Sequence, residues 1–144
     1  MIEKLLEFMF RPSKRKHHNL VLEEKYNDIP VVIKTISPEF ENEEELINEM
    51  EIELSALSRL NHPNIVKLYG AGRTTKGNRF LVLERLDGGA MAKIFDEKTL
   101  PMKDVVNMAT GISNALMHCH TSIDGCMVLH RDLKPDNIGK VACF

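Results

Sequence analysis

The sequence lacks the features that mark membrane-spanning, disulfide-stabilised and nucleic-acid-binding proteins. No stretch approaches the ~18 consecutive apolar residues that cross a bilayer, and no secretory signal opens the chain. The formal net charge of -2 offers no basic surface for nucleic acid. Three cysteines have neither metal-ligand spacing nor an even count: Cys119, Cys126 and Cys143. These absences predict a globular protein with reduced thiols in the cytoplasm or the nucleus.

Glycine is scarce in the first half of the chain, where the first one is Gly70. A backbone loop that approaches a ligand closely, with no Cβ in the way, depends on glycine. The residues before Gly70 are therefore not expected to form such a loop. With 144 residues and no internal repeat, the chain is long enough for one hydrophobic core and too short for two ordinary domains.

The most specific pattern present is the octet HRDLKPDN, from His130 to Asn137. It places a carboxylate, an ammonium group and an amide at short, fixed offsets. Five of its residues match the catalytic loop of protein kinases, and the chain therefore resembles that family: His130, Arg131, Asp132, Lys134 and Asn137. A polar turn after an apolar strand is the competing interpretation, which the combined match disfavours.

The resemblance implies a role for each side chain in phosphoryl transfer from ATP. Asp132 would receive the proton of the substrate hydroxyl, and Lys134 would place a positive charge beside the transferring group. The side-chain oxygen of Asn137 would hold Mg²⁺. A lysine two residues after the aspartate implies a Ser/Thr kinase rather than a Tyr kinase.

A small lobe of strands and one helix is predicted before this octet. Residues 20–26 and 30–36 are strand-like and flank a polar turn at Asn27 and Asp28. A capping box formed by Asn42 and Glu45 predicts a helix from residue 42 to about residue 60. Strands over residues 65–71 and 79–84 follow.

Glu53 lies on the apolar stripe of the predicted helix, between Met50 and Leu57. A buried carboxylate needs a cation, and Lys34, nineteen positions earlier, is the candidate. The spacing is similar to the kinase pair in which a strand lysine steadies the ATP phosphates and a helix glutamate holds it. A solvated surface glutamate and an unrelated lysine are the alternative.

LVLERLDGG, over residues 81–89, resembles the hinge between the two lobes of a kinase. The resemblance implies that Leu83 is the gatekeeper and that backbone groups of Glu84 and Leu86 hydrogen-bond adenine. Val21 and Val32 match residues that cover the adenine ring, and Val32 replaces the smaller alanine that is usual there.

Two apolar helix faces are candidate interaction surfaces. The apolar residues of segment 1–10 follow the spacing of an amphipathic helix, with a basic run after it. This helix would dock on its own domain, in a partner's groove or on an anionic membrane surface. A long helix is predicted after Pro101, and its apolar side would form an exposed patch: Val105, Val106, Ala109, Ile112, Leu116 and His120.

The sequence departs from the kinase pattern at two places. If Val21 is aligned with the valine after the glycine-rich loop, the three glycine positions fall on Lys14, Lys16 and Asn19. Weakened nucleotide binding is expected, because these residues do not supply glycine's backbone geometry. No Asp-Phe-Gly triplet follows Asn137. A Mg²⁺ ligand of the family is therefore missing, and little activity is expected from this chain alone.

The sequence thus predicts an α+β, bilobal kinase-like fold. Residues 1–18 form an N-terminal extension, 19–85 the small lobe, and 86–144 the hinge and part of the helical lobe. The implied cofactors are ATP and Mg²⁺, and the implied substrate is a protein. Two functions remain open: an active Ser/Thr kinase of which this sequence is an incomplete record, or a truncated pseudokinase that binds a partner through its N-terminal helix or its long helix.

Overall fold

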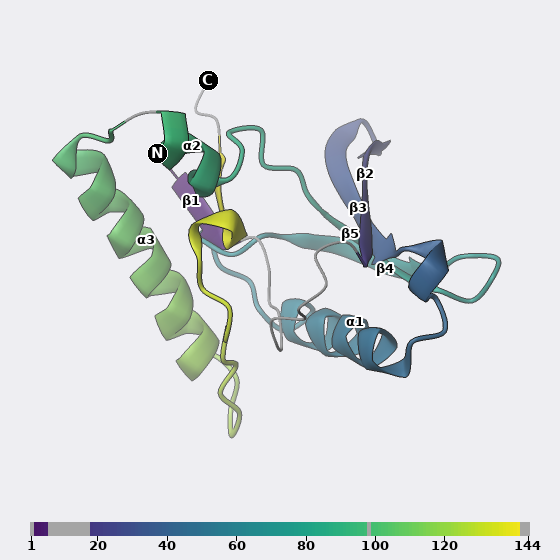
Figure 1. Cartoon of the computed structure of the whole chain (residues 1–144). Coiled ribbons are helices and arrows are strands. Elements are labelled where there is room, and N and C mark those ends of the chain that lie inside the picture. The colour runs from purple at the N-terminus through teal and green to yellow at the C-terminus, as the bar shows by residue number, and fades with distance from the viewer. Residues whose placement is uncertain (1, 6–17, 98, 142–144) are drawn as a thin grey trace.

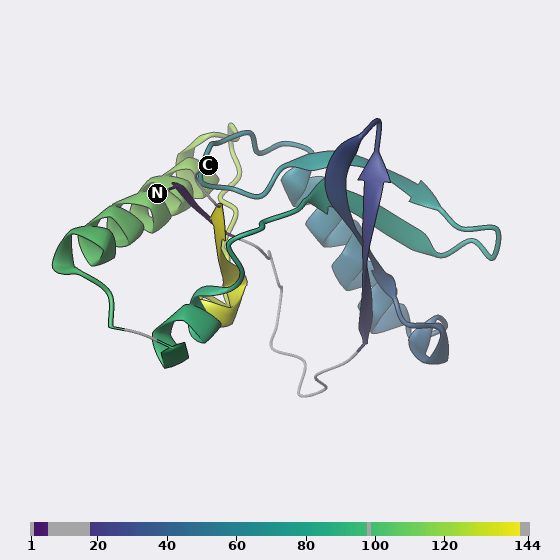
Figure 2. The same ribbon diagram turned by 90° about the horizontal axis from the view of Figure 1, so that it is seen from above.

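A computed structural model describes residues 2–5, 18–97 and 99–141. Two regions lie side by side (Figures 1 and 2). One is a four-stranded antiparallel sheet in the order β2-β3-β5-β4, with a helix packed against it. The other holds a long helix, a short helix and a two-stranded sheet. No helix in the described part of the chain is long and apolar enough to cross a bilayer.

The first hairpin joins β2 (Asn19–Tyr26) to β3 (Ile29–Ile36). Its turn residues, Asn27 and Asp28, have positive φ angles of 49° and 62°. A tight two-residue turn between twisted strands requires positive φ at both positions, and Asn and Asp tolerate it better than most residues. The predicted hairpin is confirmed.

The other two strands of the sheet are β4 (Leu68–Arg73) and β5 (Arg79–Glu84). β5 has the predicted bounds, whereas β4 begins three residues later than predicted. Ile65 and Val66, which were assigned to that strand, lie in the preceding loop and are only 2% exposed. Their apolar character serves the core rather than a strand.

Helix α1 (Glu44–Leu57) packs against the sheet, but its predicted start is wrong. Glu43 is the N-cap, and its side chain makes no capping hydrogen bond. Asn42 instead lies in a turn after a short 3₁₀ helix, η1 (Pro38–Phe40), where the amide of Glu43 donates to the carbonyl of Phe40. The capping box of Asn42 and Glu45 therefore does not form, and the helix ends at Leu57 instead of near residue 60.

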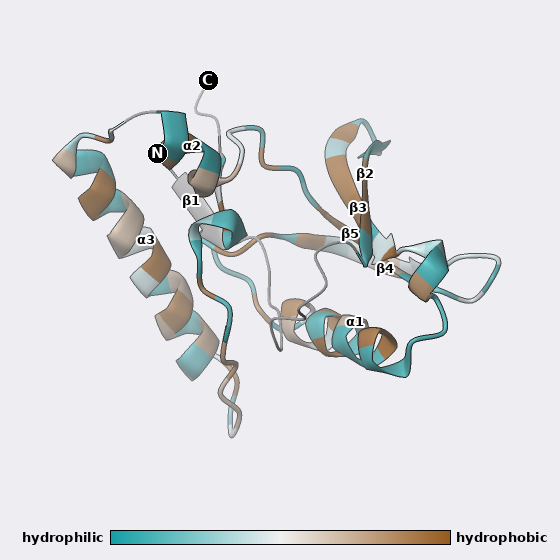
Figure 3. Cartoon of the chain, viewed as in Figure 1, coloured by the Kyte–Doolittle hydropathy of each residue, from teal (hydrophilic) through white to brown (hydrophobic). Residues whose placement is uncertain are grey.

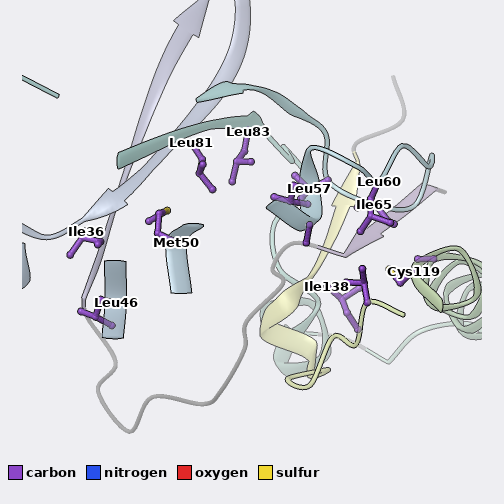
Figure 4. Close-up of a cluster of buried hydrophobic side chains, with 14 of the residues drawn as sticks. Ile36, Leu46, Met50, Leu57, Leu60, Ile65, Leu81, Leu83, Cys119 and Ile138 are labelled. Atoms are coloured by element: carbon purple, nitrogen blue, oxygen red, sulfur yellow. The ribbon is translucent and has the colours of Figure 1, made fainter. Parts of the chain in front are cut away.

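One hydrophobic core extends from the sheet into the second region (Figure 4). Leu81 and Leu83 of β5 lie near Met50 of α1. At the other end of the core, Ile138 and Cys119 join residues from the loop after α1. Because apolar burial stabilises both regions through this one cluster, neither is packed independently of the other.

The second region contains α2 (Met91–Glu97), which the sequence did not predict, and α3 (Met102–Thr121), which it did. The buried positions of α3 are small residues: Gly111, Ala115 and Cys119. The apolar side of α3 was predicted to be exposed, and Val105, Val106 and Ala109 are exposed, whereas Ile112 and Leu116 pack against the core. Small side chains let the helix approach the core closely, so the buried face is rotated away from the bulky residues. Figure 3 shows apolar residues along the whole length of α3.

Residues 2–5 do not form the predicted amphipathic helix. They form strand β1 (Ile2–Leu5), which pairs antiparallel with β6 (Ile138–Val141), with Ile2 opposite Val141 and Leu5 opposite Ile138. Figure 1 shows β1 next to α2 and α3. The rest of the predicted helix and the basic run after it lie outside the described residues.

Candidate functional site

A buried ion pair joins the sheet to α1. Lys34 Nζ lies 2.8 Å from Oε2 and 3.0 Å from Oε1 of Glu53, and the two side chains are 3% and 5% exposed. Both charges are withdrawn from water, which is tolerable only because each meets the other at hydrogen-bond distance. The predicted pairing of Lys34 with Glu53 is confirmed, and it fixes the lysine ammonium at one end of a cavity.

The cavity lies between the sheet and the segment after β5, and its volume is about 260 Å³. All the residues predicted to contact a nucleotide line it, except Glu53, which lies behind Lys34. They are Val21, Val32, Lys34, Leu83, Glu84 and Leu86. Among the catalytic-loop residues, Asn137 also lines it. Side chains from four parts of the chain therefore converge on one space.

Strand register explains why one face of the β2–β3 hairpin forms the roof of the cavity. Val21 is paired with Lys34, and Glu23 is paired with Val32. Directly opposite residues share a face, and residues two positions apart along a strand do too. Glu23 is therefore part of the site, a role that was not predicted from the sequence. Its position two residues after Val21 on a strand was the available signal.

The segment after β5 is held by backbone and side-chain contacts. The amide of Glu84 donates to the carbonyl of Lys67 at 2.9 Å, and its carboxylate accepts from the amide of Lys67 at 3.1 Å. Gly89, with a φ of 73°, donates to the carbonyl of Leu86 at 3.3 Å. Positive φ at this turn favours glycine. The backbone of Glu84 and Leu86 thus borders the cavity in a fixed conformation.

Arg85 places charge at the mouth of the cavity. Its guanidinium contacts Asp87 at 2.6 Å and Glu23 at 3.4 Å. The second contact joins β2 to the segment after β5, and it was not predicted from the sequence. Because both partners of Arg85 are well exposed, the contact is an outer border and not part of the buried site.

The catalytic-loop residues form a local hydrogen-bonded group. Lys134 Nζ lies 2.7 Å from Oδ2 of Asp132. Asn137, in the short 3₁₀ helix η2 (Pro135–Asn137), donates through Nδ2 to the same oxygen at 3.0 Å and to the carbonyl of Asp132 at 2.9 Å. Because the amide nitrogen is used in these bonds, Oδ1 is the atom with which Asn137 can bind a cation.

The loop holds a strained backbone beside Asp132. Arg131 has a φ of 62°, a left-handed conformation that disfavours side chains with a Cβ. The amide of Asp132 donates to the carbonyl of His130 at 2.9 Å and approaches its ring Nδ1 at 3.3 Å. His130 is only 3% exposed, so the strained turn is anchored in the interior. Backbone strain of this kind is concentrated at functional sites.

Two parts of the prediction, the positions of the glycine-rich loop and the metal site, are described only in part by the structure. Lys14 and Lys16, at two of the expected glycine positions, lie outside the described residues, and Asn19 begins β2. Within the described part of the chain, no three His, Cys, Asp or Glu side chains gather in a way that could hold a metal ion. Asn137, the predicted metal ligand, lies in the lining of the 260 Å³ cavity.

A larger cavity of about 550 Å³ lies elsewhere, beside the loop that follows α1. It contains none of the predicted site residues. His62 lies on its wall, and its ring centroid is 5.0 Å from that of His118 on α3. Burial, and secondarily the neighbouring His118, lowers the pKa of His62.

Known sequences show the family to which the chain belongs. The sequence model of the protein kinase domain family matches residues 19–139. The serine/threonine-protein kinase VIK of Arabidopsis thaliana is 34% identical over 110 residues, which are 76% of this chain and 24% of that protein. A probable serine/threonine-protein kinase of Clostridium perfringens is 31% identical over 75% of this chain and 15% of its own length. The chain thus spans a quarter or less of these two relatives.

Solved structures agree with the fold. The PknI kinase domain of Mycobacterium tuberculosis superposes with a TM-score of 0.65 and 22% identity, over 83% of this chain and 48% of that one. A double mutant of the same domain gives a TM-score of 0.68 and 21% identity over 93% of this chain and 54% of that one. At these identities the likeness concerns the fold, and it confirms the predicted α+β, bilobal architecture.

Proposed function

Because the chain belongs to the serine/threonine protein kinase family, we propose that it binds ATP in the 260 Å³ cavity and transfers the terminal phosphoryl group to a protein hydroxyl. The observation that carries the proposal is that Lys34 and Asn137 line the same cavity. Lys34 is hydrogen-bonded to Glu53, and Asn137 is hydrogen-bonded to Asp132. Phosphoryl transfer depends mainly on positioning and charge, and these residues supply both.

Nucleotide binding would use the roof and the border of the cavity. Val21 and Val32 present apolar side chains to a purine ring, and the backbone of Glu84 and Leu86 provides hydrogen-bonding groups beside it. The ammonium group of Lys34 would attract the phosphates. Glu53 keeps that ammonium in place, so little ordering is left to occur when the ligand binds.

The transfer step would use the catalytic loop. Oδ2 of Asp132 already accepts from Lys134 and Asn137, and we assign Oδ1 as the oxygen that receives the proton of the substrate hydroxyl. The hydroxyl oxygen then bonds to the terminal phosphorus, and the bond from that phosphorus to the leaving ADP oxygen breaks. Mg²⁺, when bound through Oδ1 of Asn137, would offset the negative charge of the phosphates.

Two assays test this proposal. In the first, a fluorescent ATP analogue is titrated with Mg²⁺ into the full chain, Lys34→Met and Lys93→Ala. We expect about tenfold weaker binding in Lys34→Met, through loss of a charge-assisted contact. Lys93, on the exposed side of α2, is the control and should leave affinity unchanged. Equal affinities in all three proteins would contradict the proposed nucleotide site.

In the second assay, phosphate transfer to a generic basic protein is compared between the full chain and Asp132→Asn. Removal of the proton acceptor should lower the rate about 10²- to 10⁴-fold. The substitution preserves the shape of the side chain, so we expect the variant to fold. Thermal unfolding of both proteins checks this. A rate unaffected by Asp132→Asn would exclude Asp132 as the proton acceptor.

A non-catalytic interaction module is the second candidate function. The observation that favours it is the exposed apolar side of α3, where Met102 is 74% and Val106 is 54% exposed. Exposed apolar residues that gather on one helix are typical of protein contact surfaces. Absence of phosphate transfer from both the full chain and Asp132→Asn, with intact folding, would favour this candidate.

A further inference from the structure

A second set of ion pairs holds α1 on the side away from the nucleotide cavity. Glu51 of α1 binds Arg79 of β5 through two parallel contacts, Nε to Oε1 and Nη2 to Oε2, each 2.9 Å long. Arg73 of β4 also reaches Oε1 of Glu51, at 3.1 Å. One carboxylate therefore joins the helix to both strands of the β4–β5 hairpin.

The geometry separates this cluster from an ordinary surface ion pair. Exposed pairs contribute little, because water and salt screen them and both side chains lose freedom. Here the arginine is planar and bidentate, which fixes direction as well as distance. The Arg79 side chain is 22% exposed and that of Glu51 36%, so the contact is partly shielded from solvent.

The cluster is connected to the Lys34–Glu53 pair at both of its ends. Glu51 is two residues before Glu53 on α1, which places the two side chains about 200° apart around the helix. The backbone carbonyl of Arg79 accepts a hydrogen bond of 2.9 Å from Oγ1 of Thr35, the neighbour of Lys34 on β3. Arg79 thus contacts the helix through its side chain and the lysine-bearing strand through its backbone.

Apart from Glu53, the buried residues of α1 are apolar. Leu46, Met50 and Leu57 bury their side chains in the core. Apolar packing holds the helix against the sheet, and the directional contacts of charged side chains restrict its rotation further. Glu53 needs that rotation to be fixed, because its oxygens must stay within about 3 Å of Lys34. Two polar attachments on opposite sides of a helix achieve this, whereas one permits rolling.

We propose that Glu51 is a positioning residue. Its ion pair with Arg79 sets the rotation of α1 about its axis. That rotation keeps the carboxylate of Glu53 within hydrogen-bond distance of Lys34, and the position of Lys34 in turn sets the affinity for the nucleotide phosphates. This inference rests on the proposed function, since it takes the nucleotide to bind at Lys34. Glu51 does not line the cavity, so any effect of Glu51 on nucleotide binding is indirect and passes through α1 or through Arg79 and β3.

The test is a double-mutant cycle in the full chain, read out with the fluorescent ATP analogue. Glu51→Gln is made alone and together with Glu53→Gln. We expect Glu51→Gln to weaken binding about fivefold in the wild-type background and not at all when Glu53 is already changed. Glu97→Gln removes a carboxylate that lies 3.8 Å from Lys93 on α2, and it is the matched control with unchanged affinity. An equal loss in both backgrounds, or none in either, overturns the proposal.

Hydrogen exchange of the α1 amides gives a readout that needs no nucleotide. Faster exchange over residues 44–57 is expected in Glu51→Gln and not in Glu97→Gln, and the charge exchange Glu51→Arg with Arg79→Glu should restore protection. Unchanged amide exchange over residues 44–57 in Glu51→Gln would contradict the proposal that Glu51 holds α1. If the wild-type chain binds no nucleotide, the proposed function fails, and the exchange experiment still decides whether Glu51 holds the helix.

Discussion

The sheet region and the α3 region are held together by different kinds of contact. In the sheet region, polar side chains bridge elements that are distant in sequence, as in Glu53 with Lys34 and Glu51 with Arg79. In α3, the side-chain hydrogen bonds of the described residues are local. Thr110, Ser113 and Thr121 each donate to a carbonyl of the same helix four residues earlier. Orientation in the sheet region is therefore fixed by charge, and in α3 by shape.

This difference matches the roles proposed for the two regions. Charged pairs have one favourable geometry, so they suit a site that must present an ammonium group at a fixed place. The α3 helix contacts the core through small residues, and several of its bulky apolar residues face outward. A surface of that kind suits contact with further protein. Four experiments would break or sharpen the contrast, starting with the largest expected effect.

Lys34→Met should be the most damaging substitution in the sheet region. It leaves the carboxylate of Glu53 buried with its lysine removed, and the loss of one partner from a buried pair costs about 3–5 kcal/mol. Urea unfolding of the variant measures this cost. Replacing both partners, Lys34→Met with Glu53→Leu, should recover most of it, because no charge then stays buried. A loss below about 1 kcal/mol for the single variant would show that water reaches Glu53.

Ala115→Leu tests the shape-based packing of α3. Ala115 has no exposed surface, and inserting three carbons into a filled core costs about 1–3 kcal/mol. Ala109→Leu, on the exposed side of the same helix, is the matched control and should change the free energy of unfolding by no more than about 0.5 kcal/mol. Similar effects at both positions in chemical denaturation would mean that the small residues do not set the helix position.

Val106→Lys tests whether the outer side of α3 is a contact surface. The substitution places a charge at a position that is 54% exposed, so the free energy of unfolding should change by no more than about 0.5 kcal/mol. Self-association should decrease, because the apolar patch is interrupted. Sedimentation velocity at several protein concentrations measures this. A concentration dependence identical to that of the wild type would show that Val106 does not contribute to self-association.

The smallest effect is expected where the two regions meet, at His62 and His118. The folded state lowers the pKa of His62 below its usual 6.5, so the unfolded chain binds the proton more readily. The contribution of His62 to the free energy of unfolding is therefore fully present above pH 6.5, and it is lost as the pH falls toward the lowered pKa of the folded state. The urea midpoint should drop between about pH 7.5 and about pH 5.5 more in the wild type than in His62→Asn. Equal drops would place the effect elsewhere.

The control for this comparison is the same pair of proteins above the titration range. Between about pH 7.5 and about pH 8.5 both should show equal changes, since His62 is neutral in both states there. Asparagine keeps an oxygen that can accept from the amide of Asn64, as Nδ1 of His62 does at 3.1 Å. A difference that persists above this range would reflect packing rather than protonation.

The sequence was most informative where local pattern and chemistry agreed. The β2–β3 hairpin followed from its alternating residues and its Asn27-Asp28 turn. The position of Glu53 on an apolar stripe predicted its buried pairing with Lys34. The set of residues around the cavity was carried over by resemblance to the kinase family, and the structure brings them together.

Features decided by distant partners were missed. Residues 2–5 have helical spacing, but pairing with β6 gives them a strand conformation, and no local pattern shows that partner. The Glu51 cluster joins residues from α1, β4 and β5. The buried positions of α3 were not predicted, because periodicity gives weight to bulky residues and overlooks Gly111 and Ala115. Tertiary packing overrides local preference in each case.

The pairing of β1 with β6 has a consequence for the order in which the chain acquires its structure. β1 is the first described element that a ribosome produces, and its partner is the last. Their contact spans nearly the whole chain, so it closes the largest loop and belongs to the slow class of non-local contacts. During synthesis the hairpin and α1 can form early. Residues 2–5 cannot pair as a strand until β6 has been synthesised. Pairing of β1 with β6 would therefore mark the point at which residues 138–141 have been synthesised and are free to fold.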